Sequence, residues 1–171
     1  MTSPLINACK SITDRAEMIN GIDHVAIWNN QIQGVIDGTG DPFHLPALFV
    51  ELLFGTQHNL GVKVTQADLT WRLHIAHEQL ISTPDQSFVV MELRDQVKKA
   101  FLGYKPTNCG RLQYVTEVPD TNHGNLYHYT IDFTCSFIDT KGSPLDPDSD
   151  DWLIKEPPTC IEINIDKENQ L

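Results

Sequence analysis

The sequence predicts an α+β protein: a mixed or antiparallel β-sheet flanked by two helices and followed by an extended acidic C-terminal arm. Three observations carry this prediction. Residues 43–54 are apolar on both faces of a strand, as in the middle of a covered sheet. Two other segments repeat apolar residues at three- and four-residue spacing, as in helices that lie on a sheet. Further segments alternate between apolar and polar residues, as in strands with one buried face.

The first helix is expected at residues 4–20. Ser3 and Pro4 form a helix start, because serine is a good cap and proline suits the first helical position. Gly21 supplies the stop. The apolar stripe between them consists of Leu5, Ala8, Cys9, Ile12, Ala16 and Ile19.

A short strand is expected at residues 24–28 and is ended by the turn-prone pair Asn29-Asn30. Residues 31–36 are interpreted as a continuation of this strand after a kink, and residues 37–42 as a loop. The two glycines of the loop do not predict a phosphate-binding site, because no Gly-Lys-Ser/Thr sequence follows and no helix opens behind them.

The central run, residues 43–54, has two interpretations. A strand is favoured, because the strand-like segments that follow need a partner. A short buried helix begun by Pro46 and stopped by Gly55 is the alternative, because alanine, leucine and glutamate favour helices. Both interpretations place the run in the core.

A long strand is expected at residues 62–79, with one buried face and one polar face. The second helix begins at Thr83-Pro84-Asp85-Gln86, a capping sequence, and ends at Gly103. Residues 112–118 and 126–138 then form a hairpin. In its second strand the alternation points Tyr127, Tyr129, Ile131, Phe133, Cys135 and Phe137 inward, and His128, Thr130, Asp132, Thr134 and Ser136 outward.

The domain is therefore assigned to residues 4–138 and the acidic arm to residues 139–171. The arm holds nine acidic residues against three lysines and has too few apolar residues for a core of its own. Two apolar islands interrupt it, at residues 152–154 and 161–165. Such islands are typical of segments that dock onto a neighbour, for example by adding a strand to its sheet.

No set of residues predicts an active site, a metal or a cofactor. His74, His77 and Glu78 lack the spacing of a zinc protease, and neighbours of opposite parity on a strand point to opposite faces, so both histidines are expected at the surface or edge. Asp146, Asp148 and Asp150 open like a calcium loop, but its glycine and final glutamate are missing. Glu51, alone in the central run, is a raised-pKa acid, the point where the strand leaves the core, or an intersubunit contact.

Composition limits which partners the protein can bind and in which compartment it is expected. A net charge of −11 argues against a tightly bound nucleic acid, because phosphate binding needs clustered lysine and arginine. The scattered cysteines, the lack of a signal-like start and the lack of a long apolar run indicate a protein assembled in the cytoplasm without a membrane span.

The order of elements, with its Pro46-Ala47-Leu48-Phe49-Val50-Glu51-Leu52 run, resembles the tail-terminator (tail-completion) proteins of long-tailed bacteriophages and their head–tail joining relatives. The resemblance covers residues 4–138. It implies a structural virion subunit, not an enzyme, that forms a hexameric ring on the tail tube. The implied partners are further copies of the chain, the tail tube protein and neck or connector proteins, with DNA only as cargo in the lumen. The acidic arm departs from the compact pattern of that family.

On this interpretation, particular residues become candidates for contacts and for the lumen. The candidate intersubunit contacts are Glu51, Trp152, Leu153, Ile154, Ile161, Ile163 and Ile165. The candidate lumen acids, which would repel passing phosphates, are Asp37, Asp41, Glu117 and Asp120. Two alternatives stay open: a small cytoplasmic enzyme or metal-dependent binding domain that uses the His74/His77 strand, and an interaction module unrelated to phage.

Overall fold

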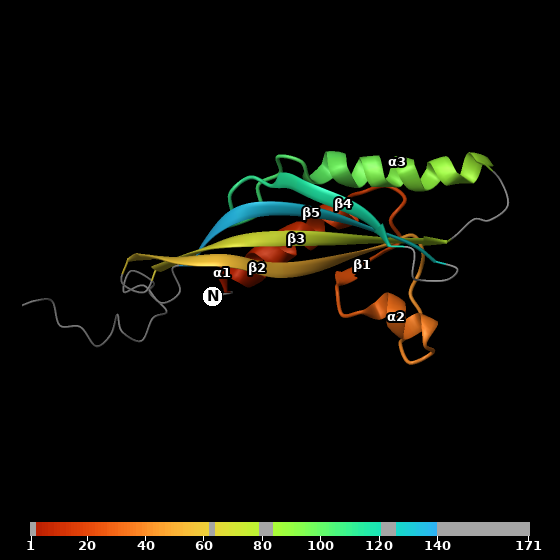
Figure 1. The fold of residues 1–171 in the computed structure, drawn as a ribbon, viewed down its shortest axis with the longest axis horizontal. Coiled ribbons are helices and arrows are strands. Elements are labelled where there is room, and N and C mark those ends of the chain that lie inside the picture. The colour runs from red at the N-terminus through yellow and green to blue at the C-terminus, as the bar shows by residue number, and fades with distance from the viewer. Residues whose placement is uncertain (1–2, 62–63, 79–83, 121–125, 140–171) are drawn as a thin grey trace, which may run out of the picture.

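The fold is α+β, as predicted. The computed structural model describes residues 3–61, 64–78, 84–120 and 126–139 (Figure 1). One five-stranded sheet has the order β1-β2-β3-β5-β4. Its strands are β1 (His24–Ile27), β2 (Ala47–Gly61), β3 (Val64–Glu78), β4 (Gln113–Asp120) and β5 (Leu126–Asp139). β1 pairs with β2 in parallel and the other pairs are antiparallel.

The central run is a strand from Ala47 onward, and the helical alternative is wrong. β2 starts directly after Pro46, and its first four residues, Ala47 to Val50, are buried on both faces. They lie between β1 and β3, with Val50 beside Ile27 on one side and beside Leu73 on the other. A strand with two hydrogen-bonded neighbours and a layer on each face has no exposed side, which explains its apolar sequence.

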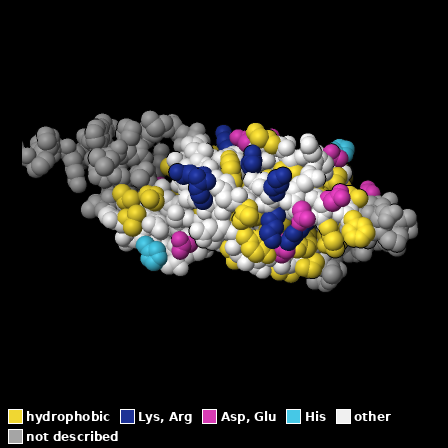
Figure 2. Space-filling model, turned by 90° about the horizontal axis from the view of Figure 1, so that it is seen from above, with side chains coloured by type: hydrophobic (Ala, Val, Ile, Leu, Met, Phe, Trp, Pro, Cys, Tyr) yellow, Lys and Arg dark blue, Asp and Glu magenta, His cyan; other side chains and the backbone are white. Residues whose placement is uncertain are grey.

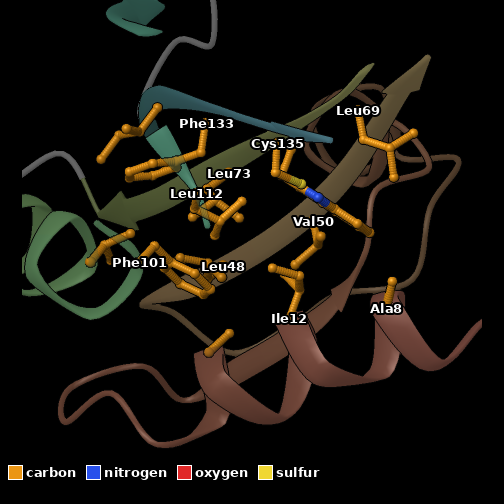
Figure 3. Close-up of a cluster of buried hydrophobic side chains, with 14 of the residues drawn as sticks. Ala8, Ile12, Leu48, Val50, Leu69, Leu73, Phe101, Leu112, Phe133 and Cys135 are labelled. Carbon is orange, nitrogen blue, oxygen red and sulfur yellow. The ribbon is translucent and has the colours of Figure 1, made fainter. Parts of the chain in front are cut away.

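Two helices cover one face of the sheet. They are α1 (Pro4–Glu17) and α3 (Pro84–Phe101). Both bury their apolar stripes against the sheet, and in Figure 3 Ala8 and Ile12 of α1 and Phe101 of α3 point into the same cluster as Leu48 and Phe133. This cluster is the main core, and it follows from the helical periodicity in the sequence.

A third helix was not predicted. Residues 31–36 form α2 (Gln31–Ile36), so the expected continuation of β1 is wrong. Asn30 takes a left-handed conformation with φ of 57°, which turns the chain out of the strand direction. Gln31 then caps the turn, because its side chain bonds to the Asn29 amide and the Ile27 carbonyl. α2 stands apart from α3, beside β1 (Figure 1).

α2 and the β1 end build a second, smaller core on the opposite face of the sheet. Ile32 of α2 packs there with Ala47, Phe49 and Ala76. Trp28 and other partly buried apolar side chains lie against this cluster. The second face of the sheet is therefore covered at one end. The central run, apolar on both faces, predicted this cover, whereas the alternation in residues 62–79 and 126–138 predicted a polar face toward solvent.

Candidate functional site

A partly buried polar cluster lies on the second face of the sheet, next to the smaller core. Its members come from neighbouring strands at matching register: Glu51 of β2 lies opposite Arg72 of β3, which lies opposite Asp132 of β5. One step along, His74 lies opposite Phe49 and Thr130, and His128 lies opposite Asp120 of β4. Side chains two apart on a strand share a face, so the register gathers these groups.

Two histidines link two carboxylates in one chain of contacts. Nε2 of His74 lies 3.1 Å from Oε2 of Glu51. Nδ1 of His74 lies 2.9 Å from Nε2 of His128, and Nδ1 of His128 lies 3.2 Å from Oδ2 of Asp120. All four ring nitrogens therefore have a hydrogen-bonding partner at contact distance.

Trp28, just after β1, covers this chain. Its ring stacks on His74 with the centroids 3.9 Å apart and an angle of 7° between the planes. It also stacks on His128, with the centroids 5.9 Å apart. The indole thus shields both imidazoles from water and joins the β1–α2 side of the molecule to the sheet.

Arg72 holds the neighbouring acids in place. Its guanidinium donates two hydrogen bonds of 2.9 Å to the carboxylate of Asp132, and its Nη1 lies 3.8 Å from Glu51. The hydrogen bond to Asp132 raises the pKa of Arg72, burial opposes the rise, and the charges of Asp132 and Glu51 add to it. A bidentate pair of this kind fixes both side chains in orientation.

These positions correct two sequence predictions. His74 and His77 were expected at the surface, yet they are only 4% and 9% exposed. His128 and Asp132 were expected to point into water, yet they are 3% and 7% exposed. The alternation assigns them correctly to the second face, but Trp28, the smaller core and the cross-strand pairs bury that face.

His74 and His77 do not form a metal site together. His74 joins the polar chain, whereas Nδ1 of His77 donates to the carbonyl oxygen of Glu78 at 2.9 Å. Within the described ranges no group of three histidine, cysteine, aspartate or glutamate side chains is placed to hold a metal ion.

The candidate lumen acids occupy different settings, and their place in a lumen stays a prediction. Asp120 belongs to the histidine chain, and Glu117 pairs with Arg94 and Lys98 of α3. Asp37 accepts a hydrogen bond from Gln33, and Asp41 is exposed.

The candidate intersubunit contacts are mostly beyond what the structure describes. Glu51 makes its ion pairs within the chain, with Arg72 and His74. Trp152, Leu153, Ile154, Ile161, Ile163 and Ile165 lie outside the described residues.

A cleft of about 270 Å³ opens between α3 and the β4–β5 hairpin. Tyr127 and Tyr129 stack along it, and burial raises the pKa of Tyr127. Met91 of α3 lines this cleft and is 59% exposed. Figure 2 looks down on the α3 side, where hydrophobic side chains surround basic and acidic ones. Apolar side chains gathered in this way mark a candidate contact surface.

The sheet also has an open edge. β1 pairs with only Ala47 to Val50, so β2 from Glu51 to Gly61 has β3 as its one partner among the described strands. Phe54 and Leu60 on this stretch are more than half exposed. Unpaired backbone groups on an edge of this length can accept another strand.

The fold and these surfaces define the class of protein: a small α+β protein with an open edge on β2 and a partly buried polar cluster. The family model of the Gp37 protein matches residues 46–149, which is more than half of the chain. The chain belongs to this Gp37 family of phage-associated proteins. The match starts at Pro46, just before β2, and includes every histidine and carboxylate of the polar chain, whereas Trp28 precedes it.

No curated protein sequence matches the chain. Among the described helices, none is long and apolar enough to cross a membrane.

Proposed function

We propose that the chain is a non-catalytic structural subunit of a phage tail or neck, a tail terminator that assembles as a ring. The ring has six copies by the resemblance to that class, caps the tail tube and joins it to the head connector. Membership of the Gp37 family supports a phage role. The net charge of −11 suits a lumen through which DNA moves without binding.

The open edge of β2 is the observation that carries this proposal. The Trp28 amide donates to the Val50 carbonyl, so the backbone groups of Val50 face the outer edge. Backbone direction alternates along a strand, and the amides of Leu52 and Phe54 therefore face outward as well. Pairing with β3 fixes the direction of these backbone amides, and a strand from a neighbouring copy can accept their hydrogen bonds.

The opposite edge of the sheet is less suited to pairing. β4 contains Pro119, which has no amide hydrogen, and its ladder with β5 is interrupted at Val115. Both features blunt an edge strand. A contact that uses the β2 edge of one copy and a different segment of the next is head-to-tail, and such contacts form a ring when the rotation between copies closes. Residues 161–165 of the acidic arm, with their alternating isoleucines, are our proposed source of the added strand.

The test is the oligomeric state of the purified chain, alone and with its tail tube, by size exclusion with light scattering and by negative stain. Rings on the tube support the proposal, and a chain that stays monomeric with the tube present contradicts it. Phe54→Pro removes an outward amide and should abolish rings while the monomer stays folded. Phe54→Thr is the matched control, because it removes the exposed ring and keeps that amide. Rings that survive Phe54→Pro would show that this edge is not the contact.

A further inference from the structure

The chain of contacts from Glu51 to Asp120 fixes a number of protons. It contains three hydrogen bonds: Glu51 to His74 at 3.1 Å, His74 to His128 at 2.9 Å, and His128 to Asp120 at 3.2 Å. Each hydrogen bond needs one hydrogen between its two atoms. The three bonds therefore need three protons.

Neutral imidazoles cannot satisfy this requirement. Each carries one N–H, and a carboxylate has none to donate. If both histidines are neutral and each donates to its carboxylate, Nδ1 of His74 and Nε2 of His128 face each other with lone pairs only. If both are fully protonated, two N–H groups face each other instead. The 2.9 Å contact between these nitrogens fits neither state. If one neutral ring donates to the other instead, a bare ring nitrogen faces a carboxylate at one end of the chain, either Glu51 or Asp120, and that contact has no hydrogen.

We propose that Glu51, His74, His128 and Asp120 form a proton-binding site, which holds one proton more than two carboxylates and two neutral imidazoles hold. The extra proton lies in the bond between the two rings and gives the histidine pair a single positive charge. This inference is independent of the ring assembly proposed above, because it depends only on contacts within one chain.

The surroundings favour that charge. The pair lies between two carboxylates, Glu51 from β2 and Asp120 from β4. Arg72 of β3, whose Nη1 lies 3.8 Å from Glu51, is engaged by Asp132 of β5 through two hydrogen bonds. With one positive charge on the pair, the described ionic groups of the cluster sum to −1; with neutral rings they would sum to −2.

The aromatic ring above the pair favours the charge too. Trp28, at the end of β1, stacks on His74 at 3.9 Å, and an indole face attracts a cation. His24 of β1 stacks on Phe43 and Phe49 instead.

The site links the proton to the fold. Loss of the extra proton removes one of the three bonds of the chain, and gain of another sets two N–H groups against each other between the rings. Trp28 stacks on both rings and is the side chain through which β1 and α2 meet the cluster. The proton therefore stabilises the contact of Trp28, between β1 and α2, with the imidazoles of β3 and β5.

The experiment is nitrogen NMR of the full chain with labelled histidine at pH 8, with His74→Gln and His128→Gln to assign the signals. Three of the four ring nitrogens of the pair should carry a proton. Two bare nitrogens in the pair, one on each ring, would overturn the proposal.

Two conservative variants test the role of the carboxylates. Glu51→Gln and Asp120→Asn each keep an acceptor oxygen and remove a negative charge, so the extra proton should leave at a lower pH than in the unchanged chain. His58→Gln is the control and should leave the signals of the pair unmoved. If a variant fails to fold, calorimetric refolding of the unchanged chain and of His74→Gln in two buffers still decides. The unchanged chain should take up one more proton per molecule at pH 8, and an equal uptake would contradict the site.

Discussion

The stability of the protein should fall as the pH rises above neutrality, because folding takes up the extra proton of the histidine pair. In the unfolded chain the two histidines titrate near their ordinary pKa of about 6.5. At pH 8 they hold one proton each, whereas the folded site holds three in total. Stability decreases with pH wherever the folded state binds more protons, at about 1.4 kcal/mol per pH unit for one proton.

The proton count also gives the pH at which the histidine pair contributes most to stability. Near pH 6.5 the unfolded pair holds three protons on average, as many as the folded site, so the contribution is flat there. Below that pH the unfolded pair holds more, and the sign reverses. Integration from about pH 6.5 to 8.5, with the unfolded histidines titrating over the first part, gives a loss of about 2 kcal/mol in the free energy of unfolding.

The assay is urea denaturation at several pH values for the unchanged chain and for His74→Gln. In His74→Gln the glutamine amide can donate to the remaining imidazole, which then stays neutral with one proton on the Asp120 side. The difference between the two profiles should therefore shrink by about 2 kcal/mol between pH 6.5 and 8.5, while other groups cancel. Parallel profiles would refute the reasoning, because they would show that both proteins take up the same number of protons.

Three further predictions concern the rest of the fold. Phe101→Ala empties a fully buried position and should cost about 3–5 kcal/mol in urea denaturation, whereas Phe88→Ala on the same helix, where the side chain is 60% exposed, should cost less than about 0.5 kcal/mol. Burial raises the pKa of Glu117, but Arg94 and Lys98 lower it overall. The stabilisation by this carboxylate is therefore present above its unfolded pKa of about 4.3 and is lost as the pH falls through its folded pKa. In acid, the thermal transition of Glu117→Gln should accordingly approach that of the unchanged chain. A chain of residues 1–139 should unfold cooperatively on heating, and loss of that transition would show that the arm belongs to the core.

The predictable part of the fold is the part set by local pattern. The stripe from Leu5 to Ile19 predicts α1 because helical spacing places those residues on one face. The two-sided apolar run after Pro46 predicts a central strand because only a covered strand hides both faces. α2 was missed because its six residues are too few to show a helical period, and its start depends on the left-handed Asn30 and the side chain of Gln31.

The polar cluster was missed for a different reason. Alternation in β3 and β5 assigns His74, His128 and Asp132 to the second face, and a polar face is ordinarily read as solvated. Two facts make it buried, and neither is local: the register that sets Glu51 beside Arg72 and Asp132, and the turn that brings Trp28 over the rings. The one available signal was Glu51, because the one carboxylate of the central run needs a partner across the sheet.

The need of Glu51 for a partner across the sheet also explains why the cluster is a chain of contacts and not a single ion pair. Glu51 lies in β2 and Asp120 lies in the edge strand β4, with β3 and β5 between them. One imidazole reaches from each middle strand, so two rings in series connect carboxylates that no single side chain could join. A series of two rings between two acceptors needs a proton in its middle. The sheet order itself therefore produces the shared proton. Replacing either histidine with glutamine, as in His74→Gln or His128→Gln, would keep a hydrogen-bonded link between the strands and remove the positive charge of the pair.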